Sequence, residues 1–427
     1  MIQPSKQLAL LGAVLLAGCS SSSSGAAPSP DAGAPADASE SAETSSPADG
    51  EPQTADASMS SSGDSASGAA DAAQVGAIQY ATSCGDAGGL PTKPSGQWAN
   101  ATGNLAGLGS ECGNLSNLSS KPDEDLLIAG VAQQGLWASK NGGGSWTRMG
   151  TATGSSTITN RTSEILYDPD HPQTFWESGI YNGGGVYETT DDGATLLVQG
   201  NVTHNDSVSV DFTDPQRQTL LAGTHEQSGH LFLSTNGGAM WTDIGAQLPA
   251  GTGFSSQALV VDAKTYLLGA YTYSNSGSGL GVFRTIDSGQ TWTQVFATAV
   301  QGHPLVMANG TIYWSLGGNA GMIVSTDQGQ SWQQTVGQGV LVTGGPVALP
   351  DGRIAALGSQ AIMISSDCGG SWSAATTSLP YSPTGVVYSP YEKAFFVWHF
   401  DCTGQNNPGD PVPTDAIMRY DFDYRTQ

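Results

Sequence analysis

Short apolar segments recur along the chain from residue 135 onwards, and each precedes a polar turn with one repeated pattern. The pattern is Ser/Thr-x-Asp/Asn-x-Gly-x-x-Trp, and one copy ends in Leu196 instead of Trp. Another apolar segment begins at the Trp position, and two more lie upstream of each turn, for example 207–212 and 219–224. Four short strands in every 40 to 51 residues are typical of a β-propeller blade. The six turns begin at Ser139, Thr189, Ser234, Thr285, Ser325 and Ser365, and the apolar strands before them occupy 135–137, 186–187, 231–233, 282–283, 322–324 and 362–364.

The residue types in the repeated turn have a local structural purpose. Asp, Asn, Ser and Thr side chains hydrogen-bond nearby backbone N–H groups, Gly adopts the positive φ of a tight hairpin, and Trp packs the hairpin onto its blade. The carboxylates of Asp287, Asp327 and Asp367 are therefore predicted to stabilise turns and not to act in catalysis.

The number of blades follows from the two ends of the repeat array. After the sixth turn, the segments 385–389, 394–400 and 416–422 provide only three strands. The segment 95–100, which contains Trp98, can supply the fourth from the N-terminal side. The prediction is an all-β fold, a single seven-bladed β-propeller over residues 76–427, closed by an N-terminal strand that protects the sheet edge.

The repeated turn resembles the Asp-box, or bacterial neuraminidase repeat, in all six copies. Asp-boxes occur in the propellers of sialidases, sortilin-type receptors, xyloglucan-cleaving glucanases and plant photosystem assembly factors. The resemblance implies a propeller of this superfamily. It also implies a functional site on the face opposite the boxes, which is where sialidases carry theirs.

The N-terminus has the features of an export signal. Residues 1–18 contain Lys6 and an apolar run at 8–16, which is too short to span a bilayer. The sequence Leu16-Ala17-Gly18-Cys19 resembles the bacterial lipobox, which implies lipidation of Cys19, with an ordinary secretory signal as the alternative. Ser20 stands where Asp would resemble a signal for inner-membrane retention, so in a Gram-negative bacterium the resemblance implies sorting to the outer membrane or cell surface. Residues 19–75 consist mainly of Ser, Ala, Asp, Pro and Gly and are predicted to form a disordered tether.

The charge balance limits the possible partners. The chain has 13 Lys and Arg against 37 Asp and Glu, a formal net charge of −24, so nucleic-acid binding is excluded as a function class. The lipid anchor is the only predicted membrane contact. The expected partner is a polysaccharide or glycoconjugate, bound by a monomer.

The position of a residue along its predicted blade assigns it to one of the two faces of the propeller. His171 lies on the face of the repeated turns, whereas the other five histidines fall at or near the opposite face. A cleft with histidines, carboxylates and aromatic rings but few Lys or Arg residues is typical of a saccharide site. The simpler explanation is that these polar residues merely occupy long loops. The catalytic candidates are Arg161, Glu177, Tyr181, His204, Asp206, His225 and Glu226, and the substrate-binding candidates are His230, Tyr271, His303, Trp314, His399 and Asp401.

Several chemistries remain open for this face. A sialidase needs three arginines around the substrate carboxylate, and only Arg161 is suitably placed, so a true sialidase is excluded. Glycoside hydrolysis needs two carboxyl groups at a defined separation. Elimination at a uronate needs a group that neutralises the carboxylate and a His or Tyr that takes the C5 proton. A protein- or glycan-binding propeller without catalysis is the alternative from another class.

No cofactor is expected. A divalent metal on His204, His225, Glu226 and His230 is a lesser possibility because the spacing of these residues matches no standard motif.

The four cysteines that follow Cys19 are predicted to pair by face. Cys84 and Cys368 lie on the face of the repeated turns, and Cys112 and Cys402 lie on the opposite face. A disulfide tolerates a Cα separation of only about 7 Å, so the predicted bridges are Cys84–Cys368 and Cys112–Cys402.

Overall fold

Seven antiparallel sheets of four strands form a seven-bladed β-propeller, as predicted. The computed structural model describes residues 78–85, 94–111, 114–272, 279–335, 337, 339–342, 344–400 and 409–426. The predicted signal, the tether, Cys19, Cys112, Asp401 and Cys402 lie outside these residues. Helical structure in them is limited to three short 3-10 turns at Gly103–Leu105, Gly245–Gln247 and Gly317–Asn319. Within the same residues, no helix has the length and apolar character needed to cross a membrane.

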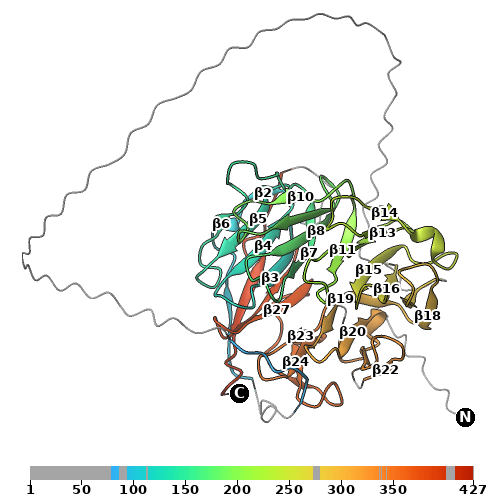
Figure 1. Cartoon of the computed structure of the whole chain (residues 1–427). Helices are drawn as coiled ribbons and strands as arrows, with labels where there is room; N and C mark the ends of the chain where they lie inside the picture. The colour runs from blue at the N-terminus through green and yellow to red at the C-terminus, as the bar shows by residue number, and fades with distance from the viewer. Residues whose placement is uncertain are drawn as a thin grey trace, which may run out of the picture. The chain divides into compact units, whose positions relative to one another are not determined.

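The blades follow one another along the chain, each beginning with its innermost strand (Figure 1). Blade 1 contains β3 (Leu115–Ser120), β4 (Leu127–Val131), β5 (Gly135–Ser139) and β6 (Thr147–Arg148), and blade 2 contains β7 (Arg161–Tyr167), β8 (Phe175–Ile180), β9 (Val186–Thr189) and β10 (Leu197–Val198). Blade 3 contains β11 (Asn205–Val210), β12 (Leu220–Thr224), β13 (Leu231–Ser234) and β14 (Thr242–Asp243), and blade 4 contains β15 (Ser255–Val260), β16 (Tyr266–Tyr271), β17 (Gly281–Thr285) and β18 (Thr293–Phe296). Blade 5 contains β19 (Val300–Val306), β20 (Ile312–Leu316), β21 (Met322–Ser325) and β22 (Gln333–Gln334), and blade 6 contains β23 (Val347–Ala348), β24 (Ile354–Leu357), β25 (Ile362–Ser365) and β26 (Ser373–Ala374).

The two ends of the propeller meet in blade 7, which confirms the predicted closing strand. This blade contains β27 (Gly385–Ser389), β28 (Ala394–Trp398), β30 (Ile417–Asp421) and, as its outermost strand, β1 (Trp98–Asn100). Trp98 of β1 lies opposite Tyr420 of β30, with ring centroids 5.1 Å apart. A two-stranded ribbon of β2 (Gly109–Ser110) and β29 (Asp410–Pro411) adds a second connection between the ends. Figure 1 shows β27 beside β3, where the ring closes.

The repeated turns form the same hydrogen bonds in each blade from 1 to 6. In the turn of blade 4, Gly289 N donates to Thr285 Oγ1 at 3.1 Å and Thr291 N donates to Asp287 Oδ1 at 2.9 Å. Gly289 has a φ of +83°, which favours glycine because it has no side chain to clash. Hydrogen bonds from the Thr285 and Thr291 side chains and from Thr291 N lower the pKa of Asp287 to about 2. Asp287 is therefore committed to its turn, as the sequence indicated.

The hydrophobic core consists of seven layers, each between two neighbouring blades. Between blades 2 and 3, for example, Trp176 and Val186 pack against Val208 and Leu220. Burying this much apolar surface between sheets is the main source of stability in such a fold, since each large side chain contributes about 1.5 to 3 kcal/mol. The layers hold the strands rigidly, so the connections at the two faces start from fixed positions.

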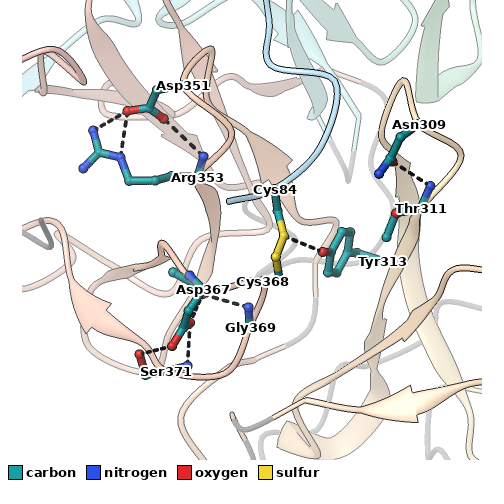
Figure 2. The surroundings of a disulfide bond; sticks show 11 residues. Cys84, Asn309, Thr311, Tyr313, Asp351, Arg353, Asp367, Cys368, Gly369 and Ser371 are labelled. Carbon is teal, nitrogen blue, oxygen red and sulfur yellow. Dashed lines mark hydrogen bonds and ion pairs between the residues drawn. A yellow bond between two sulfur atoms is a disulfide. The ribbon is translucent and has the colours of Figure 1, made fainter. Parts of the chain in front are cut away.

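The predicted Cys84–Cys368 disulfide is present on the face of the repeated turns (Figure 2). It fixes an N-terminal segment, residues 78–85, across blades 5 and 6. Ala81 N donates to the carbonyl of Pro350 at 2.8 Å, and the carbonyl of Thr82 accepts from Asn309 N at the same distance. Tyr313 Oη lies 3.0 Å from Cys84 Sγ. The second predicted bridge lies outside the described residues.

Candidate functional site

Seven of the predicted site residues come together on the face opposite the repeated turns, over blades 2, 3 and 4. They sit at strand ends or in the connections between second and third strands and between successive blades, so the fold positions each from a fixed strand. The cluster comprises Arg161 at the start of β7, Tyr181 after β8, His204 and Asp206 at the start of β11, His225 and Glu226 after β12, and Tyr271 at the end of β16.

A chain of hydrogen bonds connects three of these residues. Asp206 Oδ1 lies 2.9 Å from His225 Nδ1, and His225 Nε2 lies 3.0 Å from Tyr181 Oη. Tyr271 Oη donates to the other oxygen of Asp206 at 3.0 Å. Asp206 and His225 are buried, so the carboxylate orients the imidazole in a site of low dielectric constant. This chain reaches Tyr181, which also interacts with Glu226 and is only partly buried.

Arg161 is held beside this chain by a carboxylate that the sequence analysis missed. Arg161 Nε donates to Glu111 Oε1 at 3.0 Å, and Asn182 Nδ2 donates to the same oxygen at 2.6 Å. Gln133 Nε2 donates to Glu111 Oε2 at 2.8 Å, so both carboxylate oxygens are occupied. The guanidinium carbon lies 4.7 Å from the centre of the Tyr181 ring. Glu111 precedes β3 on the site face, and the same face assignment that selected Arg161 would also have included it.

The two histidines next to Tyr181 have opposite pKa shifts. Burial and the neighbouring His225 lower the pKa of His204, which keeps its imidazole neutral near pH 7. Burial alone would lower the pKa of His225 too, but the carboxylates of Asp206 and Glu226 outweigh it and raise this pKa. Burial and the nearby Glu226 raise the pKa of Tyr181 to about 12, so the phenol stays protonated. A neutral imidazole and a more basic one thus both contact the ring of a phenol donor.

The backbone is strained at the same residues. Tyr181, Asn182, His204 and Glu226 all have positive φ, at 55°, 29°, 57° and 54°. For residues with a Cβ, this region costs about 1 kcal/mol or more each, and such residues cluster at functional sites. The strain directs the Tyr181, His204 and Glu226 side chains toward one cluster, where the Tyr181 ring meets both imidazoles edge-on at centroid distances of 5.4 and 5.2 Å.

Two predicted site residues lie in the protein interior, which corrects the sequence analysis. Glu177 is 0% exposed in the middle of β8, on the same side of the strand as Phe175, and Asn160 Nδ2 donates to its Oε2 at 3.2 Å. Trp314 is also 0% exposed and packs in the layer between blades 4 and 5. Its indole nitrogen donates to the carbonyl of Gly302 at 2.8 Å. Because both side chains are buried, neither can reach a ligand. The repeat pattern predicts where a strand ends but not the direction in which a side chain points, which is why the sequence analysis placed them in the site.

The three other histidines predicted for this face lie apart from the cluster. His230 is half exposed and bonds to Asp243 at 2.6 Å. His303 lies within β19, where its Nδ1 is 3.2 Å from Glu164 Oε1. His399 follows β28, with the Tyr381 ring 4.1 Å from its own. Within the described ranges, no group of three or more His, Cys, Asp or Glu residues could hold a metal ion.

Comparisons with known proteins identify similar folds only. No family model matches the chain, and no curated protein matches it. Among solved structures, the GH74 xyloglucanase from Xanthomonas campestris is 14% identical, with a TM-score of 0.49 over 77% of this chain and 56% of its own. An ancestral GH74 enzyme is also 14% identical, with a TM-score of 0.41 over 74% of this chain and 39% of its own. YCF48 from Cyanidioschyzon merolae is 12% identical, with a TM-score of 0.44 over 76% of this chain and 98% of its own.

This chain therefore spans about half the length of the two hydrolases. At this level of identity, function has to be argued from the site itself.

Proposed function

We propose that this propeller binds a uronate-containing polysaccharide and cleaves it by β-elimination. One observation carries the proposal: the Tyr181 ring contacts two histidines whose pKa values are shifted in opposite directions, and the guanidinium of Arg161 lies beside the same ring. Groups whose environments push their pKa values apart are suited to opposite parts in acid–base catalysis. We further propose that the protein is an exported lipoprotein, anchored through Cys19 at the outer membrane or cell surface.

In this mechanism, Arg161 binds the uronate carboxylate. Its Nε is occupied by Glu111, and in the described part of the chain its two terminal nitrogens have no partner, so a planar pair of donors remains for a carboxylate. Neutralising that carboxylate makes the C5 proton more acidic. Exchange of Arg161 for Lys would remove the paired geometry.

The proton transfers then follow from the protonation states. Neutral His204 takes the C5 proton, and the electron pair of that bond forms the C4–C5 double bond. The C4–O4 bond breaks, and the Tyr181 hydroxyl donates its proton to the leaving oxygen. The protonated form of His225, which its raised pKa favours, returns a proton to Tyr181, and Asp206 stabilises the imidazolium before the transfer. Proton exchange of the two histidines with water restores the starting state.

Hydrolysis is less well supported by the carboxylates of the cluster. Asp206 is bonded to His225 and Tyr271, and Glu111 accepts three hydrogen bonds. Glu226 Oε1 lies 3.7 Å from His225 Nε2, so the third carboxylate is engaged as well. Hydrolysis needs two carboxyl groups that can act as the acid and as the base or nucleophile.

The proposal is tested on the soluble propeller with a panel of uronate and neutral polysaccharides. The ultraviolet absorbance of unsaturated uronates and the release of reducing ends are measured together. His204→Ala and Tyr181→Phe should each lower kcat/KM by about 10²- to 10⁴-fold on the active polymer. The matched control is His171→Ala, because His171 lies on the opposite face and should not affect the rate.

Two outcomes would favour the alternatives. Reducing ends without unsaturated products would indicate a glycoside hydrolase. Binding of a glycan or protein without any turnover would indicate a non-catalytic propeller, for which the mutual hydrogen bonding of Asp206, His225 and Tyr271 would serve to hold a rigid binding surface.

A further inference from the structure

The loop between β8 and β9 carries Tyr181 and holds three successive residues at positive φ. Tyr181, Asn182 and Gly183 have φ values of 55°, 29° and 125°. Residues with a Cβ rarely adopt positive φ, and they keep it only where the surrounding structure fixes them. The contacts that fix this loop therefore decide where the Tyr181 side chain lies.

Two residues of the connection that leads into β7 bind this loop. Asn160 Nδ2 donates to the carbonyl of Gly184 at 2.9 Å, and Thr159 Oγ1 donates to the carbonyl of Asn182 at 2.6 Å. The two carbonyls lie on either side of Gly183, so the most strained part of the loop is held at both ends. The binding residues come directly before β7, which is the innermost strand of the same blade.

Asn160 has one favourable orientation in the protein interior. Its side chain is 0% exposed, and Nδ2 also donates to Glu177 Oε2 at 3.2 Å. An amide group has two N–H donors on its nitrogen and only acceptors on its oxygen. The reverse orientation would place that oxygen against the carbonyl of Gly184, which would then lose its donor. The buried amide thus holds the Gly184 carbonyl in a defined place.

Two glycines leave the space that these contacts need. A Cβ at Gly179 of β8 would overlap Asn160 Nδ2, and a Cβ at Gly183 would lie 2.7 Å from Thr159 Oγ1. Gly179 does not have a positive φ, so its backbone conformation does not require glycine. A glycine within a strand weakens the strand and often marks a place where another group approaches closely. The close approach of Asn160 explains the glycine at position 179.

A displacement of the loop would change one part of the cluster more than the other. Tyr181 Oη lies 3.0 Å from His225 Nε2, so this bond would lengthen or break. Arg161 Nε donates to Glu111, which precedes β3 and is also held by Gln133 Nε2. Arg161 therefore keeps a partner outside the loop.

We propose that Asn160 and Thr159 are positioning residues, which hold the Tyr181 hydroxyl against His225. Both act through the loop and not on the substrate. Their effect on the rate rests on the proposed reaction, in which Tyr181 donates a proton to the leaving oxygen. Their effect on the bond between Tyr181 and His225 does not depend on that reaction.

The first test observes His225 by NMR in the soluble mature chain with ¹⁵N-labelled histidine, at one pH and without substrate. Tyr181→Phe removes the hydroxyl and gives the Nε2 chemical shift of His225 without this bond. Asn160→Ala should move the shift at least half of the way to the Tyr181→Phe value, and Thr159→Val should move it in the same direction. Thr157→Val is the matched control, because Thr157 is exposed and its carbonyl, not its side chain, accepts a hydrogen bond from Tyr187 Oη. It should leave the shift unchanged.

The second test measures kcat and KM on the polymer that the unaltered protein cleaves. A catalytic group that is misplaced by about 1 Å can cost about 10²-fold in rate, so Asn160→Ala should lower kcat by about 10- to 100-fold. KM should stay within about threefold, because Arg161 keeps its partner. Thr157→Val should leave both values unchanged.

The proposal is overturned if Asn160→Ala and Thr159→Val both leave the His225 shift at the value of the control. If Asn160→Ala fails to fold, Thr159→Val alone decides by the same comparison. An unchanged kcat in a folded Asn160→Ala protein with a displaced His225 signal would overturn the role in catalysis. If the unaltered protein cleaves no polymer, the proposed reaction fails, while the NMR comparison still decides whether Asn160 and Thr159 position Tyr181.

Discussion

Replacing Glu177 by Gln should stabilise the protein increasingly as the pH rises. Glu177 is 0% exposed in β8, and burial raises the pKa of its carboxyl from 4.5 to about 8 despite hydrogen bonds from Asn160 and Thr162. The folded state therefore keeps a proton that the unfolded chain releases above about pH 4.5. The stability that the protonated Glu177 carboxyl contributes, relative to the ionised form, is fully present below pH 4.5 and is lost as the pH rises through 8.

The size of the effect follows from the shift. One pKa unit corresponds to about 1.4 kcal/mol, so a shift of this size destabilises the ionised protein by up to about 5 kcal/mol. Between pH 5 and pH 8.5, the free energy of unfolding of Glu177→Gln should gain about 4 kcal/mol relative to the unaltered protein. Gln keeps the shape and hydrogen-bonding capacity of the neutral acid without the proton equilibrium.

The assay is equilibrium unfolding in urea at pH 5, 6, 7 and 8.5, followed by tryptophan fluorescence without reductant. Asp421→Asn is the control, because Asp421 is 81% exposed and its partner Arg419 keeps its charge from pH 5 to 8.5, so the difference from the unaltered protein should stay constant with pH. A constant difference for Glu177→Gln would refute the argument that burial holds this acid neutral. Loss of cleavage in a folded Glu177→Gln protein would return Glu177 to the functional site.

Three further predictions concern the cluster, the net charge and the disulfide. Asp206→Asn removes a carboxylate that raises the pKa of His225 against the effect of burial, so this pKa should fall. The alkaline limb of the pH–rate profile should then move to lower pH, and an unchanged limb would exclude proton return from His225 to Tyr181. Because a protein of net charge −24 repels a polyanionic substrate, kcat/KM should rise several-fold as ionic strength increases from about 0.01 M to about 0.15 M, whereas a fall would indicate a cationic binding surface. The double variant Cys84→Ser, Cys368→Ser should lose up to about 5 kcal/mol of stability, since the bridge spans 284 residues, while kcat/KM should stay unchanged because the bridge lies on the opposite face.

The sequence predicted the architecture because the repeated turn marks the same point in six blades. That reference point also assigned residues to a face, and the structure places Tyr181, His204 and His225 close together there. The Cys84–Cys368 pairing was confirmed for the same reason. Each of these predictions depends only on where a residue falls along a blade.

The errors arose where the direction of a side chain decides its environment. Glu177 lies in the middle of a strand, and its side chain points to the same side as that of Phe175, into a layer between blades. Trp314 looks like a sugar-stacking ring in the sequence, but it fills the core between blades 4 and 5. Glu111 was missed because its three donors, Arg161, Asn182 and Gln133, come from distant parts of the chain.

The most direct test of the proposed reaction is the mass of the products. The unaltered soluble propeller is incubated with the uronate polymer that it depolymerises best, and the fragments are analysed by mass spectrometry. The mechanism with His204 as base and Tyr181 as acid predicts fragments that are lighter by one water than hydrolysis products, with the double bond at the new non-reducing end. Fragments of full hydrolytic mass, or no fragments from any uronate polymer, would contradict it.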